Sequence, residues 1–216
     1  MEQSSLILLH ICCAPCATTV IKRLEMVGYK VYGYFYNPNI HPTKEYYQRL
    51  AETKRICQIW DIPLLIGDYD WDRWQAAVHG LEKEKEGGKR CLVCYRFRLA
   101  AVAQKAKELE IGAVASTLTL SPKKRASDIN SIGKEICEEL GLKFYEADWK
   151  KQDGFKQSVT ICKEMNIYRQ NYCGCKYSIR PTKIPPTKVI TEVKNELAES
   201  LPKHLRKKKT KPWRQK

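Results

Sequence analysis

The sequence predicts an α/β fold built on a doubly wound parallel sheet. Short apolar runs of strand length alternate along the chain with longer segments whose apolar residues recur at helical spacing. Several of these segments end at glycine or proline. Such alternation places helices on both faces of a parallel sheet, where binding sites form at the carboxyl ends of the strands.

The first three elements predict a strand, a helix and a second strand. Residues 5–11 (SLILLHI) are a short apolar run, typical of a buried strand. Residues 16–28 carry apolar residues at helical spacing and end at Gly28, which suits the end of a helix. Residues 30–38 (KVYGYFYNP) are β-branched and aromatic, and the strand they predict ends at a turn before Pro38.

The middle of the chain predicts one strand and three helices. Residues 42–61 predict a helix with Pro42 in its first turn, and residues 62–70 predict a third strand. Residues 70–112 have helical character throughout but contain Gly87 and Gly88. We therefore expect two helices there that are separated at this glycine pair.

The last predicted elements repeat the same order. Strands are expected over 112–120 and 142–149, and helices over 127–141 and 153–166. The helix at 127–141 opens with a serine that can cap it.

Three later prolines, Pro181, Pro185 and Pro186, mark a domain boundary. We expect an α/β domain with a metal site over 1–180 and a C-terminal appendage with a basic tail over 181–216.

The 216-residue chain carries a net charge of +15, and residues 201–216 hold eight Lys or Arg and no acid. This excess predicts a polyanionic partner, either a nucleic acid or an anionic membrane surface. We favour nucleic acid because basic residues recur in the body of the chain, at Lys123, Lys124 and Arg125. No apolar stretch approaches the roughly 20 residues of a membrane span, and no secretory signal precedes the first strand. We expect a cytoplasmic protein.

Ten cysteines in a cytoplasmic chain indicate metal binding or catalysis before structural disulfides. Cys57, Cys137 and Cys162 lie in the middle of predicted helices, on or beside their apolar stripes. Buried cysteine packs as a small hydrophobic residue, so we expect these three in the core.

Two of the remaining cysteine groups predict a metal site. Cys12 and Cys13 follow the first strand, while Cys91 and Cys94 open a helix whose N-terminus favours thiolate. Four thiolates suit either zinc or an iron-sulfur cluster. We favour a [4Fe-4S] cluster, because adjacent cysteines are unusual in a zinc knuckle. Cys16 is a ligand, a neighbour or a packing residue, and the sequence leaves this open.

Cys173 and Cys175 flank Gly174 and predict a different kind of site. If they pair, they close a small strained ring that is easily reduced, which suits a pair that cycles between dithiol and disulfide. Alternatively they hold an additional iron beside the cluster.

The position after the first strand excludes a nucleotide-phosphate loop. It reads CCAPC, and neither a G-x-G-x-x-G nor a Walker sequence occurs elsewhere. ATP and NAD are thus not expected as ligands, and electrons must come from an external donor.

The motifs CCAPC, YFYNPNIHPTKEYYQR (34–49), RCLVCYRFRL (90–99), STLTLSPKK (116–124) and YRQNYCGCKYS (168–178) together resemble the QueH family, the cobalamin-independent epoxyqueuosine reductases. The resemblance runs in order from about residue 5 to 180. It implies a nucleotide-alpha-hydrolase type of fold in which sulfur replaces the ATP loop. It also implies two-electron conversion of epoxyqueuosine to queuosine at the wobble position of tRNA, with loss of the epoxide oxygen as water.

By motif match, the resemblance makes Cys12, Cys13, Cys91 and Cys94 the [4Fe-4S] ligands and Cys173 with Cys175 the redox-active pair. Candidate substrate-binding residues are Lys123, Lys124, Arg125 and Arg169. Asp153 and Tyr172 are both candidates for protonating the leaving oxygen. The alternatives are a zinc-thiolate RNA-binding protein and a cytosolic dithiol oxidoreductase.

Overall fold

The computed structural model describes residues 5–179, and within them the predicted α/β architecture is confirmed. One five-stranded sheet has the order β3-β2-β1-β4-β5, and every neighbouring pair is parallel. The strands are β1 (Ser5–His10), β2 (Tyr29–Phe35), β3 (Leu64–Ile66), β4 (Ala113–Ser116) and β5 (Lys143–Phe144). The helices are α1 (Ala14–Met26), α2 (Thr43–Ile59), α3 (Trp71–Ala77), α4 (Lys89–Glu108), α5 (Ala126–Glu139) and α6 (Gly154–Glu164).

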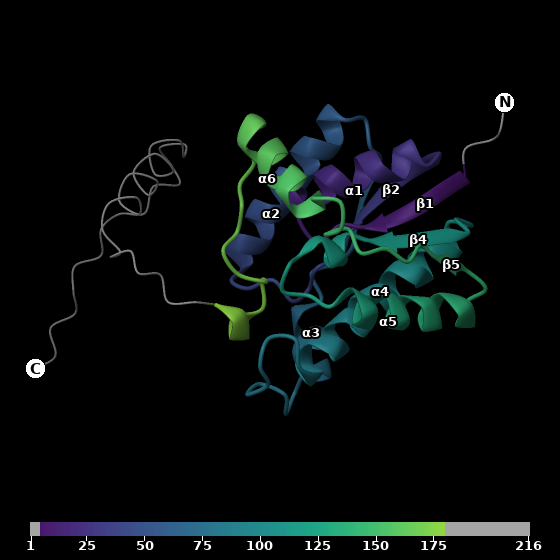
Figure 1. The fold of residues 1–216 in the computed structure, drawn as a ribbon. Helices are drawn as coiled ribbons and strands as arrows, with labels where there is room; N and C mark the ends of the chain where they lie inside the picture. The colour runs from purple at the N-terminus through teal and green to yellow at the C-terminus, as the bar shows by residue number, and fades with distance from the viewer. Residues whose placement is uncertain (1–4, 180–216) are drawn as a thin grey trace, which may run out of the picture. The chain divides into compact units, whose positions relative to one another are not determined.

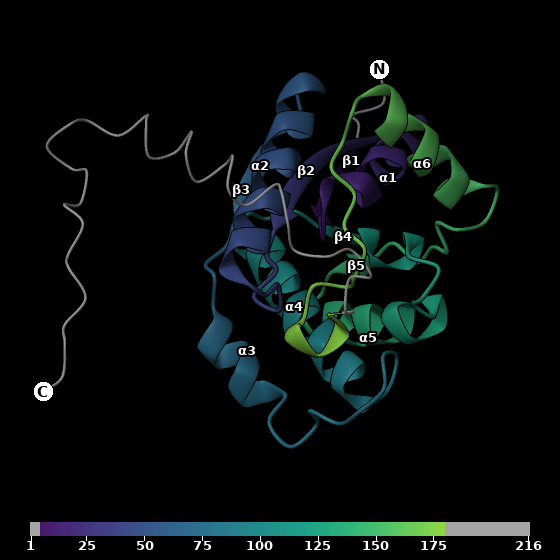
Figure 2. The same cartoon turned by 90° about the vertical axis from the view of Figure 1, so that its left-hand side faces the viewer.

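Helices cover both faces of the sheet (Figures 1 and 2). Helices α1, α2 and α6 lie on one side, and α4 and α5 lie on the other, with α3 beside α4. Successive strand residues point to opposite faces. Accordingly Leu9 of β1 packs in the cluster that contains Leu24 of α1, whereas Leu8 packs with Leu99 of α4. The two buried faces explain why β1 is apolar throughout.

The order of the strands places a switch point beside β1. The chain leaves β1 for β2 and β3, then returns to pair β4 with the other side of β1. The connections after β1 and β4 therefore diverge at the carboxyl edge of the sheet and open a crevice, the usual ligand site of such folds. Cys12 and Cys13 stand at this point, immediately after β1.

Several predicted elements are shorter than expected. The helix predicted to follow residue 70 ends at Ala77, and the chain then turns through Gly80, which has a φ of +80°. The strand predicted over 112–120 ends at Ser116, because the Ser116 hydroxyl accepts a hydrogen bond from the backbone N–H of Leu118 at 3.2 Å. That bond starts the 3-10 turn η1 (Thr117–Leu120). The strands predicted over 62–70 and 142–149 also contain only short paired segments.

Two helix starts differ in detail from the sequence prediction. Helix α5 begins at Ala126 after Arg125, so Ser127 lies inside the first turn and does not cap it. Pro42 is the residue before α2 and not part of its first turn. The three cysteines expected in the core are confirmed there, since Cys57, Cys137 and Cys162 are all buried.

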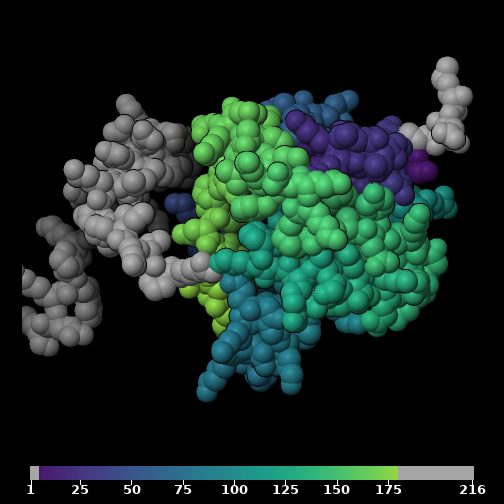
Figure 3. Space-filling model, in the orientation of Figure 1, coloured from purple at the N-terminus to yellow at the C-terminus, as the bar shows by residue number. Residues whose placement is uncertain are grey.

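Residues 165–179, here called the closing segment, run from the end of α6 across the carboxyl edge of the sheet to the 3-10 turn η2 (Lys176–Ser178). Figure 3 shows this yellow-green segment at the molecular surface. Among residues 5–179, no helix is long and apolar enough to cross a bilayer. The expected C-terminal appendage and basic tail lie outside the described residues.

Candidate functional site

The first cysteine group sits at the switch point and is tightly packed. The sulfur atoms of Cys12, Cys13 and Cys16 lie within 4.8 Å of one another, and in the described range theirs is the one group of three or more potential metal ligands this close. Cys13 directly precedes α1, and Cys16 lies in its first turn. We call these three residues the N-terminal thiol group. The structure thus brings Cys16 to Cys12 and Cys13, a placement that the sequence left open.

One negative charge is stabilised within the N-terminal thiol group. Hydrogen bonds from Cys13 and Cys16 hold the pKa of Cys12 well below its ordinary value, although burial opposes the shift. The same hydrogen bonds to Cys12 raise the pKa of Cys13 to about 12 and that of Cys16 well above its ordinary value. Thr117 of η1 adds a hydroxyl hydrogen bond to the Cys12 sulfur at 3.2 Å.

The other four cysteines of interest form a second set, here called the α4 thiol group. Cys91 and Cys94 lie three residues apart at the start of α4, and the electrostatic influence of Cys173 and Cys175 reaches both. Cys94 and Cys175 also pack in the same apolar cluster as Trp74 of α3. The sequence grouped Cys91 and Cys94 with Cys12 and Cys13, and the structure adds Cys173 and Cys175 to the surroundings of Cys91 and Cys94.

The thiols of α4 do not titrate in the direction expected from their place at a helix N-terminus. Burial raises the pKa of Cys91, even though the Gly87 N–H donates to its sulfur at 3.2 Å. Burial likewise raises the pKa of Cys94 to about 11. In this apolar setting, the loss of solvation raises the thiol pKa more than the helix N-terminus lowers it.

Two cations, Arg98 and Lys124, interact electrostatically with cysteines of both thiol groups. Arg98 of α4 favours the thiolate form of both Cys12 and Cys94. Burial by itself would lower the pKa of Lys124, but attraction to Cys173, Tyr95, Cys12 and Cys16 raises it above its ordinary value. Positive charge therefore lies where several thiolates would otherwise repel one another.

A buried network holds Arg98 in place. Its guanidinium contacts the Asn37 carboxamide oxygen and lies 3.3 Å from Nε2 of His10. Burial and the nearby Arg98 charge lower the pKa of His10 to about 3, so the imidazole is neutral. Nδ1 of His10 lies 2.9 Å from the Ser116 hydroxyl. A neutral histidine thus positions the arginine without adding a second charge.

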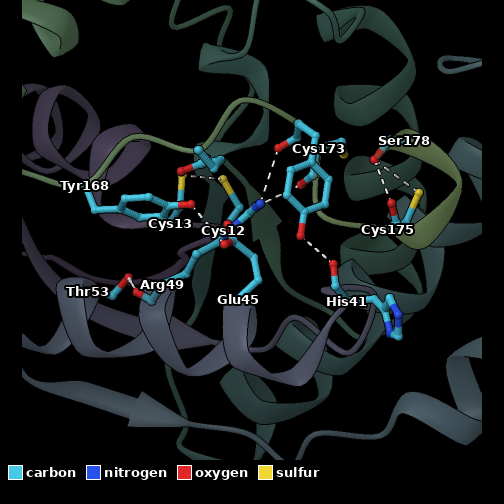
Figure 4. A network of polar contacts seen from close by, with 12 residues as sticks. Cys12, Cys13, His41, Glu45, Arg49, Thr53, Tyr168, Cys173, Cys175 and Ser178 are labelled. Atoms are coloured by element: carbon cyan, nitrogen blue, oxygen red, sulfur yellow. Dashed lines mark hydrogen bonds and ion pairs between the residues drawn. The ribbon is translucent and has the colours of Figure 1, made fainter. Parts of the chain in front are cut away.

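The closing segment is fixed by α2. Arg49 is buried and ion-paired with Glu45 at 2.7 Å. Its guanidinium also donates to the backbone carbonyls of Cys173 at 3.0 Å and Tyr172 at 3.3 Å. Figure 4 shows Arg49 reaching from the helix toward Cys173, with Cys12 and Cys13 close by. The loop between the two cysteines needs Gly174, whose φ of +128° is unfavourable for other residues.

A pocket of about 160 Å³ opens between these parts. Its lining includes Cys12, Cys16 and Cys173, the carboxylate of Glu86, and five cations, namely Arg49, Arg98, Lys123, Lys124 and Arg169. Two lining residues, Asn39 and Gln170, each have a buried side-chain oxygen without a hydrogen-bond partner. Unpartnered buried acceptors are costly, so donor groups of a ligand would be favoured there.

The pocket contains most, but not all, of the residues expected to bind substrate. Lys123, Lys124 and Arg169 line it. Arg125 does not, and instead pairs with Asp128 at 2.8 Å on the exposed start of α5. Of the two candidate proton donors, Tyr172 lines the pocket and Asp153 does not.

Sequence reasoning missed Arg49, Arg98, Asn37 and Asn39, which complete the site. Each lies in or near a motif that was recognised, but nothing local indicates that an arginine in the middle of a helix will be buried. A buried arginine becomes visible only when its distant partners are in place.

The donor chemistry of this region fits a thiophilic metal group. Seven cysteines from three stretches of chain make up the two thiol groups, and none of the ten cysteines forms a disulfide. The N-terminal thiol group is compact enough for one ion. Thiolates suit either a zinc ion or an iron-sulfur cluster, and both thiol groups supply donors of that kind.

Among solved structures, the fold is similar to that of the U34-tRNA thiolase NcsA from Methanococcus maripaludis with its [4Fe-4S] cluster. The TM-score is 0.53 at 10% sequence identity, over 83% of this chain and 63% of that chain. At this identity the likeness concerns the fold alone.

Sequence comparison gives much closer relatives. The chain is 38% identical over 199 residues to the epoxyqueuosine reductase QueH of Streptococcus pyogenes serotype M1, covering 89% of this chain and 78% of the relative. It is 35% identical over 176 residues to that of Thermotoga maritima, covering 80% and 90% respectively. Residues 7–181 also match the family described as epoxyqueuosine reductase QueH. These matches show that the chain belongs to the QueH family.

Proposed function

We propose that this protein is an epoxyqueuosine reductase that acts on tRNA in the cytoplasm. The main observation behind this proposal is the pocket at the switch point, which is lined by thiols and five cations. The chain also matches the QueH family over residues 7–181. The cations suit an RNA substrate, because phosphates supply most of the binding energy in nucleic-acid complexes. The thiols suit a redox-active group that is bound among them.

For the metal centre, we propose that Cys12, Cys13, Cys91 and Cys94 hold a [4Fe-4S] cluster. When bound, such a cluster supplies electrons one at a time from an external donor. Cys173 and Cys175 are proposed as the second redox centre, either as a dithiol or as ligands of an additional iron. Their place beside Cys91 and Cys94 supports this role.

The protein groups have three tasks in this reaction. Arg98 and Lys124 offset the negative charge of the thiolates. Asn39 and Gln170 offer oxygen atoms that can accept hydrogen bonds from substrate hydroxyl or amine groups. The walls of the pocket restrict solvent around the reacting ring. The wobble base must leave its stack to enter, as bases do in other enzymes that modify them.

The overall step consumes two electrons and two protons. Both carbon–oxygen bonds of the epoxide break, a carbon–carbon double bond forms, and the oxygen leaves as water. Tyr172 is the better placed of the two candidate proton donors, since it lines the pocket. Burial raises the pKa of Tyr172 to about 12, so its phenol carries a proton at neutral pH. Its hydroxyl donates to the carbonyl of His41, and this hydrogen bond must break before the phenol can give its proton to the leaving oxygen.

The test is anaerobic reconstitution with iron and sulfide, followed by incubation with a reductant and tRNA that contains epoxyqueuosine. Nucleosides from the digested tRNA are then quantified by mass spectrometry. We expect a brown protein that converts epoxyqueuosine to queuosine. A cluster-loaded protein that leaves epoxyqueuosine unchanged would refute the proposal.

The two alternatives give different results in the same experiment. A colourless protein that retains zinc and binds tRNA without turnover would indicate a zinc-thiolate RNA-binding protein. Thiol-disulfide exchange without metal would indicate a dithiol oxidoreductase. Cys137→Ala serves as the matched control, because Cys137 is buried in α5 with other core side chains and belongs to neither thiol group.

A further inference from the structure

We propose that Phe155, together with Arg169, forms a stacking platform at the pocket for a base that flanks the reacting nucleotide in a single-stranded RNA loop. This inference rests on the proposed function, because it assigns a further part of the RNA substrate to the same pocket. It adds an aromatic contact that the sequence motifs did not single out.

Phe155 is placed where such a base would lie. It lines the pocket, yet the residue remains 38% exposed. The guanidinium carbon of Arg169 lies 5.5 Å from the centre of its ring. Arg169 thus covers part of the phenyl ring and adds a positive charge beside it, while the exposed part stays open to a ligand.

The platform is held firmly against the N-terminal thiol group. Ser158, one turn after Phe155 on α6, is buried and donates to the Pro15 carbonyl at 2.6 Å, next to Cys16. The carbonyl of Gly154 accepts from Thr19 of α1 at 3.3 Å. A Cβ at residue 154 would come within 1.9 Å of the Trp149 carbonyl, so the start of α6 packs against backbone. The start of α6, which carries Phe155, is therefore anchored beside the N-terminal thiol group.

The size of the pocket requires contacts outside it. A volume of about 160 Å³ is well below the roughly 300–1,000 Å³ of sites that enclose drug-sized ligands. It has room for a reacting ring but not for the neighbouring nucleotides. Those nucleotides must follow the rim, where Lys123 and Arg169 offer charge for phosphates.

The positive charge and the exposed aromatic ring at this rim favour single-stranded RNA as its ligand. A lone exposed phenylalanine is ordinary, but here it stands among cations at a concave site. Proteins bind single strands by combining basic grooves with aromatic rings on which unpaired bases stack. A base pair in a duplex has no free face to offer. An acidic protein partner would match the charge but would not need the ring beside the pocket.

The test uses full-length protein and an anticodon stem-loop RNA with plain guanine at the wobble position and 2-aminopurine next to it. Stacking of 2-aminopurine on an aromatic ring quenches its fluorescence. We expect wild-type protein to quench the probe on binding. Phe155→Leu should abolish the quench and weaken binding about tenfold, because it retains apolar bulk but removes the aromatic face. Phe155→Trp should preserve both.

Tyr32→Leu is the matched control. Tyr32 is an aromatic residue with a cation over its ring, Lys30 at 5.9 Å, but it does not line the pocket. It should bind and quench as wild type does. If Phe155→Leu binds and quenches like the wild type, the stacking platform is refuted. Equal weakening toward a duplex RNA of the same length would also refute it, because duplex binding does not use stacking.

Failure of this inference is distinguishable from failure of the proposed function. If Phe155→Leu converts epoxyqueuosine in tRNA with unchanged KM and kcat, the platform fails and the reductase assignment stands. A rise in KM with little change in kcat and unchanged iron content supports the platform. If wild type neither binds the stem-loop nor converts the tRNA, the proposed function itself fails.

Discussion

The two thiol groups use the same residue type in contrasting environments. In the N-terminal thiol group, neighbouring thiols and Arg98 stabilise a thiolate at Cys12. In the α4 thiol group, burial raises the pKa of Cys91 and Cys94. The N-terminal thiol group holds one negative charge, at Cys12, whereas Cys13, Cys16, Cys91 and Cys94 all need a bound cation to make their thiolates stable. The comparison teaches that cysteine spacing predicts candidate ligands, whereas burial and charge decide how readily each thiol ionises.

The largest expected effect tests whether both groups serve one cluster. Cys91→Ala should abolish the colour of the reconstituted protein and its turnover, because a missing thiolate leaves one iron without a protein ligand. Iron and sulfide analysis with an absorption spectrum checks this, and Cys137→Ala should keep both properties. A full cluster in Cys91→Ala would remove this residue from the ligand set and separate the two groups.

The next effect divides the α4 thiol group itself. Cys175→Ser should retain the main cluster and lose turnover by about a hundredfold or more, because the second redox centre is broken. The measurement pairs cluster quantification with queuosine formation under excess reductant. Turnover at the wild-type rate would end the assignment of Cys173 and Cys175 as a redox-active pair.

A smaller effect is expected for Cys16, which the structure adds to the N-terminal thiol group. Cys16→Ala should retain iron but reduce turnover by about tenfold or less, since the hydrogen bond it gives Cys12 helps to stabilise the thiolate. Iron content decides between this role and direct ligation. Loss of iron comparable with that of Cys91→Ala would make Cys16 a ligand.

The last prediction concerns ionisation in the metal-free protein and does not involve turnover. The pKa of Cys12 lies well below the ordinary thiol value and that of Cys94 lies near 11, so the Cys12 thiolate persists to lower pH. At pH 7.5, iodoacetamide should alkylate Cys12 at least about tenfold faster than Cys94. Peptide mass spectrometry over a pH series measures both rates.

Arg98 offers a control for the electrostatic part of this difference. Arg98→Gln should move the pH profile of Cys12 upward because a stabilising positive charge is lost, whereas Arg98→Lys should move it less. Identical profiles for the wild type and both variants would show that the neighbouring thiols alone stabilise the Cys12 thiolate.

Local patterns in the sequence predicted most of the fold and part of the site. Apolar periodicity located every strand and helix of the sheet, and the position of Cys12 and Cys13 after the first strand indicated the edge at which the site would form. The predicted first helix of residues 70–112 was too long because Gly80 ends it earlier than the glycine pair at 87–88. The predicted fourth strand was too long because the Ser116 side chain captures a backbone N–H.

By itself, the sequence determined the alternation of elements and the family motifs, and it predicted that the cysteines are reduced and bind metal. These properties depend on residue type and short spacing, which can be read along the chain. Only the tertiary structure decided that Cys16 joins Cys12, that Cys91 and Cys94 lie with Cys173 and Cys175, and that Arg49 and Arg98 are buried beside them. The physical reason is that desolvation and Coulomb interactions depend on distances between residues up to about 160 positions apart, and folding alone sets those distances.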